Sequence, residues 1–233
     1  MRLRSWVAAL AATACLAACS LPATSPTGGA SKTATNSAAS TLKQHVQPDW
    51  DADGKTIKPT AIVLHWWGGW GGGHNIDRLV RDANANSSNY DPKKKSTDDR
   101  PIVGHVTVQI GITGDGKAYQ LTPKLNTFAR HAKCANQWAV GIEIEGNGPG
   151  SEHYIGDNKT QFNSVVTVVR QLMRIYGIKP VSVVADDGRS GRGIVSHKMV
   201  DATCRWADGK HAGEGKDDVD DAYLKSVLKS VGG

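Results

Sequence analysis

The chain has 233 residues, of which 39% are hydrophobic and 21% charged, so it is neither a disordered chain nor a coiled coil. It contains no run of eighteen apolar residues, which excludes a protein that crosses a membrane several times. Its net charge of +6 invites a nucleic-acid interpretation. However, the only dense basic run, residues 93–95, lies in a polar stretch without a nucleic-acid motif, so we expect no nucleic-acid partner.

The N-terminus has the pattern of an export signal. A basic start, Met1–Arg4, precedes an apolar run of about a dozen residues, which is too short to span a bilayer. The run ends in Leu-Ala-Ala-Cys at Cys19, which resembles the bacterial lipobox, whose cysteine is lipidated. We interpret residues 1–18 as a lipoprotein signal peptide, the alternative being an ordinary signal cut near Ala18. The mature chain would carry a net charge of +4 and be exported to the cell envelope, lipid-anchored to a membrane.

Residues 20–40 are rich in Ser, Thr and Ala, carry one charge and show no periodicity. Such a segment cannot bury enough apolar surface to offset chain entropy. We therefore expect a lipidated cysteine and flexible linker over residues 19–42. One domain follows over residues 43–233, with its core at about 57–231.

The folded part reads as alternating strands and helices. We expect strands over residues 60–65, 106–112, 117–121, 139–145 and 193–196, with the second and third paired as a hairpin around Asp115-Gly116. Apolar residues from Phe162 to Tyr176 recur at helical spacing before Gly177, and a second helix is expected over 219–231. This irregular order predicts a single α/β domain with a central mixed β-sheet flanked by helices.

Two histidines lie where predicted strands end. His65 ends the strand at 60–65 before a Gly-rich loop, and His197 directly follows the strand at 193–196. A carboxylate pair, Asp217-Asp218, comes about twenty residues later. Two histidines and one carboxylate, with an open fourth position, are the ligand set of a hydrolytic zinc site. No HExxH or CxxC spacing is present, and each histidine alone also fits a structural, hydrogen-bonded role.

A second signal lies in the strand at 139–145. Alternation places Val140, Ile142 and Ile144 on one face and Glu143 and Glu145 on the other. Two carboxylates on one face of an apolar strand are costly unless they serve a polar cleft. Either could act as a general base, and a solvent-exposed strand face is the alternative.

Six segments, in order, resemble the zinc-dependent N-acetylmuramoyl-L-alanine amidases of the type 2 amidase family, whose fold is shared with peptidoglycan recognition proteins. The resemblance covers about residues 57–231. The matching segments are residues 62–65, 114–123, 129–132, 136–143, 196–198 and 216–218.

This resemblance implies an enzyme that cleaves the amide between N-acetylmuramic acid and L-alanine of peptidoglycan. The Zn²⁺ ligands, one ion per chain, would be His65, His197 and Asp218. Glu143 would match the catalytic glutamate, and Lys216 the lysine that stabilises the oxyanion.

The resemblance also implies substrate contacts. His131 and Asn136 lie in its matching segments near the expected cleft. Trp66, which follows His65, could form part of an aromatic wall for sugar rings, with core packing as the alternative.

The third metal ligand stays open at this point. Val219 and Asp220 stand where the family usually has Pro-Gly, and Cys204 lies seven residues after His197, where some relatives have a cysteine ligand. We prefer Asp218, because the lysine accompanies it. If Cys134 and Cys204 form a disulfide, as an exported pair can, Cys204 is not a ligand.

The leading hypothesis is therefore a monomeric, surface-tethered amidase that acts on peptidoglycan or muropeptides and remodels the cell wall. The alternative is a non-catalytic muropeptide-binding module of the same fold. The intact set of candidate ligands together with Glu143 favours the enzyme.

Overall fold

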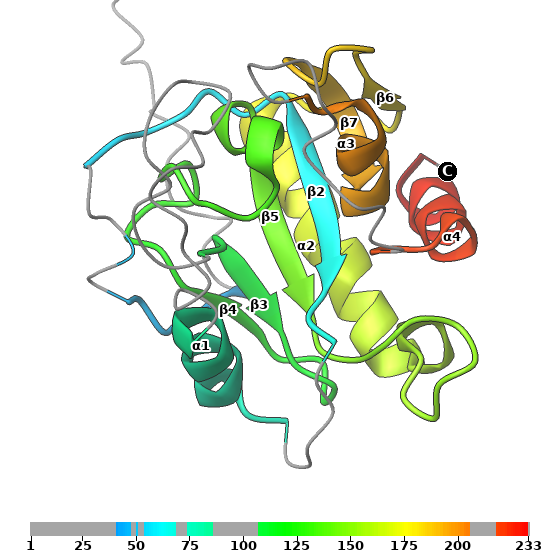
Figure 1. Cartoon of the computed structure of the whole chain (residues 1–233). Coiled ribbons are helices and arrows are strands. Elements are labelled where there is room, and N and C mark those ends of the chain that lie inside the picture. The colour runs from blue at the N-terminus through cyan, green and yellow to red at the C-terminus, as the bar shows by residue number, and fades with distance from the viewer. Residues whose placement is uncertain are drawn as a thin grey trace, which may run out of the picture. The chain divides into compact units, whose positions relative to one another are not determined.

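A computed structural model gives the structure of the chain (Figure 1) and describes residues 41–47, 50, 54–68, 74–85, 107–205 and 218–232. The expected signal peptide, Cys19, the linker to residue 40, Lys216 and Asp217 lie outside the described residues. Among those described, no helix combines the length and apolarity needed to cross a membrane. The elements are β1 (Lys43–Gln44), β2 (Ala61–Trp66), α1 (Ile76–Ala85), β3 (Ile110–Ile112), β4 (Ala118–Gln120), the 3-10 helix η4 (Lys133–Gln137), β5 (Ala139–Ile144), the 3-10 helix η5 (Ile155–Asp157), α2 (Lys159–Tyr176), β6 (Ser182–Val184), β7 (Gly191–Ser196), α3 (His197–Thr203) and α4 (Asp221–Gly232).

The strands of the described part form one mixed sheet in the order β1-β4-β3-β5-β2-β7-β6. The central strands β3, β5, β2 and β7 run parallel, whereas β4 and β6 are antiparallel to their neighbours β3 and β7. The expected mixed α/β sheet and the β3–β4 hairpin are therefore confirmed. In the hairpin turn, Gly116 adopts a φ of 78°, which a glycine accommodates without strain.

Helices α2 and α4 cover one face of the sheet. Their apolar residues pack on the alternate side chains of the central strands, among them Ile62, Ile142 and Ile194. Asn158 caps α2 by accepting a hydrogen bond from the backbone N–H of Gln161, and Gly177 ends it in the left-handed conformation. This is the amphipathic helix that the apolar spacing predicts.

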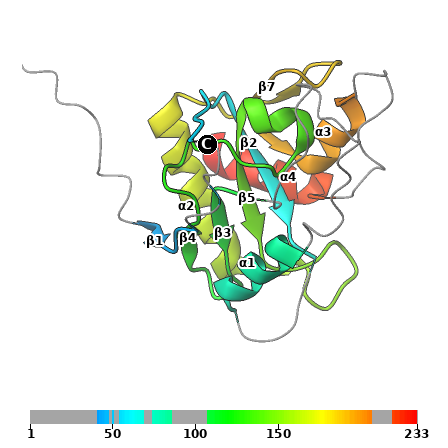
Figure 2. The ribbon, with the colours of Figure 1, turned by 60° about the vertical axis from the view of Figure 1, so that its left-hand side comes forward.

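The opposite face is covered by α1, η4 and α3, so both faces of the sheet carry helices (Figure 2). None of these three helices was among the expected elements. Helix α1 carries apolar residues at helical spacing, Ile76, Leu79, Val80 and Ala83, so its signal is present in the sequence. Helix α3 is short, and it begins where we expected only the end of a strand.

Candidate active site

Three buried donor groups converge where β2 and β7 end. His65 lies in β2, His197 opens α3 directly after β7, and Asp218 lies just before α4. Because β2 and β7 are adjacent parallel strands, their carboxyl ends meet at one edge of the sheet. The two Nδ1 atoms are 3.1 Å apart, and Asp218 Oδ2 lies 3.6 Å from that of His65 and 3.2 Å from that of His197.

These distances can be compared with those of a zinc site. Ligand bonds of about 2.0–2.1 Å in a tetrahedron place neighbouring donor atoms about 3.3 Å apart. The three observed separations, 3.1, 3.2 and 3.6 Å, bracket that value. Two imidazole nitrogens and one carboxylate oxygen are also donors that Zn²⁺ accepts. The residues therefore fit the ion.

Asp218 and His197 each have a second polar atom, which points away from the three converging donors, and each of these outer atoms contacts another group of the protein. Asp218 Oδ1 accepts a hydrogen bond of 2.6 Å from the backbone N–H of Trp66. His197 Nε2 lies 3.3 Å from Asp201 Oδ1 in an ion-pair contact, and Asp201 Oδ1 accepts a hydrogen bond of 2.9 Å from Lys133 Nζ. These contacts hold the inner atoms toward the common centre.

The carboxylates and imidazoles of this cluster stabilise one another's charged forms. Burial disfavours protonation of His197, but Asp201 and Asp218 outweigh it and raise the pKa of His197 to about 9. Burial likewise disfavours ionisation of Asp218, but the neighbouring His197 and His65 outweigh it and hold the pKa of Asp218 far below the usual value. The site thus keeps Asp218 ionised, which is the state a metal requires.

His131 lies behind His65 rather than on an open surface. Its Nδ1 is 3.0 Å from His65 Nε2, its Nε2 is 3.2 Å from the carbonyl oxygen of Ala139, and its side chain is buried. Asn136 is also engaged internally, because its side-chain oxygen accepts hydrogen bonds from the backbone N–H groups of His131 and Ala132. Both side chains are therefore engaged in contacts inside the protein.

The two carboxylates of the β5 region have different surroundings. Glu143 is half-buried and pairs in register with His65 on β2, so both side chains project from the same face. Glu145 lies just beyond β5 and is buried. Its Oε2 accepts a hydrogen bond of 2.6 Å from the backbone N–H of Gly114 and lies 3.3 Å from His74 Nδ1. The position of Glu143 beside His65 therefore favours it over Glu145 as the carboxylate for chemistry at this cluster.

Trp66 is half-buried and packs against the sheet core on the α2 side. Its ring also lies so close to Gly148 that a Cβ there would come within 2.7 Å of it. Much of this side chain is therefore used in packing, which was the alternative to an aromatic wall for sugars.

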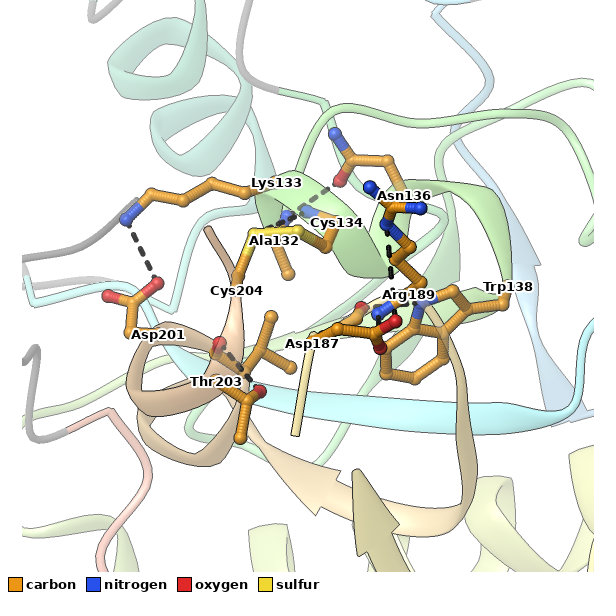
Figure 3. The surroundings of a disulfide bond; sticks show 12 residues. Ala132, Lys133, Cys134, Asn136, Trp138, Asp187, Arg189, Asp201, Thr203 and Cys204 are labelled. Carbon is orange, nitrogen blue, oxygen red and sulfur yellow. Dashed lines mark hydrogen bonds and ion pairs between the residues drawn. A yellow bond between two sulfur atoms is a disulfide. The ribbon is translucent and has the colours of Figure 1, made fainter. Parts of the chain in front are cut away.

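The structure contains a disulfide between Cys134 and Cys204 (Figure 3). It joins η4 to the residue that follows α3, close to the Lys133–Asp201 ion pair. The Cys204 sulfur is consequently bonded to carbon and sulfur, and Asp218 is the third donor of the cluster.

Sequence reasoning missed Asp201 and Lys133 as parts of the site. Asp201 follows His197 by four residues, which places both on one side of a helix. That spacing was a usable signal, but it has meaning only if residues 197–203 are helical. Lys133 is far from Asp201 in the sequence, and no local sequence pattern indicated that the two residues would be in contact.

Comparisons with known proteins agree with this architecture. The model of a family described as N-acetylmuramoyl-L-alanine amidase matches residues 55–216, more than half of the chain. No curated protein sequence matched the chain. Among solved structures, the Staphylococcus aureus hydrolase AmiA in complex with its ligand has 15% identity and a TM-score of 0.50, over 82% of this chain and 81% of that one. A mutant endolysin from Bacillus subtilis has 18% identity and a TM-score of 0.50, over 82% and 99%. At these identities, the two structures show a shared fold.

Proposed function

The chain belongs to the N-acetylmuramoyl-L-alanine amidase family, and we propose that it is a zinc-dependent member that cleaves the amide between N-acetylmuramic acid and L-alanine of peptidoglycan. One observation carries the proposal: donor atoms of His65, His197 and Asp218 lie 3.1–3.6 Å from one another, with Glu143 on the adjoining strand. This combination is what hydrolysis of an amide by a metal enzyme requires.

The three donors would hold one Zn²⁺ per chain. Zinc bound there supplies a Lewis acid that polarises the scissile carbonyl and makes water a better nucleophile near neutral pH. The protein's own contribution is the fixed, buried arrangement of donors, since Trp66 and Asp201 orient Asp218 and His197 from outside.

Glu143 would be the general base and acid. It accepts a proton from the attacking water as the water oxygen bonds to the carbonyl carbon. It then delivers that proton to the amide nitrogen as the carbon–nitrogen bond breaks, which yields a carboxylic acid and a free amine. Lys216, which lies outside the described residues, would place a positive charge near the oxyanion that forms during the attack.

The test is digestion of purified peptidoglycan by the protein, followed by mass spectrometry. We expect release of stem peptides with a free N-terminal L-alanine. A chelator should abolish the release and added Zn²⁺ should restore it, whereas His65→Ala should stay inactive with Zn²⁺ present. Retention of muropeptides without release would instead identify the non-catalytic binding module.

We also propose that the mature protein is a monomer tethered to a membrane of the cell envelope through a lipid on Cys19. The support is the lipobox-like sequence before Cys19 and the following linker. Labelled palmitate should enter the wild-type chain but not Cys19→Ser. Light scattering of the purified protein should give the mass of one chain.

A further inference from the structure

The geometry points to His131 as a positioning residue that fixes the tautomer and orientation of His65 for metal binding. This inference rests on the proposed zinc site, and it gives His131 a role other than substrate contact. It follows from a chain of contacts that starts at a backbone carbonyl and ends at the inner nitrogen of His65.

The direction of the hydrogen bonds is set by the carbonyl oxygen of Ala139. A carbonyl oxygen only accepts, so His131 Nε2, 3.2 Å away, must carry a proton. In the neutral ring, His131 Nδ1 is then an acceptor, and His65 Nε2, 3.0 Å away, must donate to it. His65 Nδ1 is left with a lone pair directed at His197 and Asp218, as a metal ligand requires.

The surroundings keep His131 in the neutral form that this chain of contacts needs. Its side chain is buried, and burial disfavours the charged form of an imidazole. A charged His131 would donate from both nitrogens and could not accept from His65. The neutral ring is therefore the form that fits both of its contacts.

The fold makes a specific place for this ring. A Cβ at Gly141 on β5 would lie 2.7 Å from His131 Cγ and Nδ1, so the glycine leaves the space that the imidazole occupies. The same Gly141 donates its backbone N–H to Gln109 Oε1 at 2.7 Å. The side-chain oxygen of Asn136 fixes the backbone here by accepting hydrogen bonds from the N–H groups of His131 and Ala132. His131 is thus held by side chain and main chain alike.

Most metal-bound histidines donate their outer N–H to a carboxylate, a carbonyl or water. Here the outer N–H of His65 meets a neutral imidazole, whereas that of His197 meets the carboxylate of Asp201. The two histidine ligands thus have outer partners of different charge. Both partners depend on the segment from His131 to Asn136, because Lys133 in that segment pairs with Asp201 (Figure 3).

The experiment compares His131→Phe with His131→Gln. Phe keeps the ring volume but loses both nitrogens, while Gln carries an acceptor and a donor at nearly the spacing of the imidazole nitrogens. Val169→Ala, buried in α2 away from the site, is the control for general destabilisation. The measurement is the zinc dissociation constant by competition with a chromophoric chelator, together with the visible spectrum of the Co²⁺-loaded protein.

We expect His131→Phe to weaken zinc binding about 10- to 100-fold and to alter the Co²⁺ spectrum, with His131→Gln recovering most of the affinity. Gly141→Ala, which displaces the ring without removing a donor, should weaken binding in the same direction. Val169→Ala should leave the affinity unchanged.

Equal zinc affinity in wild type and His131→Phe would overturn the inference, and so would equal losses in His131→Phe and His131→Gln. Failure of the wild type to bind zinc at all would instead contradict the proposed function. The two failures are therefore distinguishable in the same titration.

Discussion

His65 and Glu143 are paired in register on the parallel strands β2 and β5, so a candidate metal ligand and a candidate proton carrier project side by side from one face of the sheet. Backbone hydrogen bonds fix this relationship, and no loop has to order before the two groups meet. Catalytic groups on rigid strands keep their geometry better than groups on loops.

This pairing predicts that Glu143→Gln removes activity while leaving the metal site intact. The amide cannot accept the proton of the attacking water, so the rate should fall about 10²- to 10⁴-fold. Zinc content, measured by mass spectrometry of the metal, should stay at one ion per chain. Glu145→Gln is the comparison, because Glu145 is engaged with Gly114 and His74, and it should retain most of the activity. Equal losses in the two variants would argue against Glu143.

Asp218→Asn should abolish tight zinc binding. The neutral amide is a poor ligand, and it removes the charge that balances the two imidazoles. Asp220→Asn is a matched control two residues away. Asp220 instead accepts hydrogen bonds from the backbone N–H groups of Ala222 and Tyr223 at the start of α4. Isothermal titration should find zinc bound to the control and not to Asp218→Asn. Tight binding by both variants would exclude Asp218 as a ligand.

Asp201→Asn should weaken zinc binding without removing a ligand. Asp201 Oδ1 is the outer partner of His197, and loss of such a partner costs about 10- to 100-fold in metal affinity. Asp187→Asn is the control, because Asp187 pairs with Arg189 on the surface and is exposed (Figure 3). Zinc competition assays should separate the two variants, and indistinguishable affinities would contradict the role of Asp201.

The strands that carry His65 and Glu143 could be predicted from sequence, because apolar runs and alternation depend on neighbouring residues. The contacts of His65 with His131 and of Lys133 with Asp201 could not be predicted from sequence, because the two residues of each pair are 66 and 68 positions apart. Their contacts depend on how η4 packs against the sheet and α3. The resemblance identified the residues His131 and Asn136 but not their use inside the protein.

The β3–β4 turn offers a test of pH dependence away from the site. Burial opposes ionisation of Asp115, but hydrogen bonds from Lys117 and Thr113 outweigh it and lower the pKa of Asp115 from 3.8 to about 2. The charge therefore stabilises the fold fully above about pH 4, and the effect disappears as the pH falls through about 2. Because the Asp115 side chain is partly exposed and its partner Lys117 is half exposed, screening keeps the contribution to about 0.5 kcal/mol.

Urea unfolding at pH 7 should show that Asp115→Asn has a lower free energy of unfolding than the wild type, by about 0.5 kcal/mol. The two proteins should become equally stable near pH 2, where the wild-type carboxyl is protonated. A difference of the same size at both pH values would show that the charge of Asp115 is not its cause.

The Cys134–Cys204 disulfide should stabilise the protein without being part of the metal site. It closes a loop of 70 residues, and the chain-entropy relation gives about 4 kcal/mol for a loop of that length. The double variant Cys134→Ala, Cys204→Ala should unfold at lower urea concentration by about 2–4 kcal/mol and still bind one zinc ion. Dithiothreitol should lower the stability of the wild type and leave the double variant unchanged. Loss of stoichiometric zinc binding in the folded double variant would instead make Cys204 a ligand, because Asp218 and both histidines remain in place.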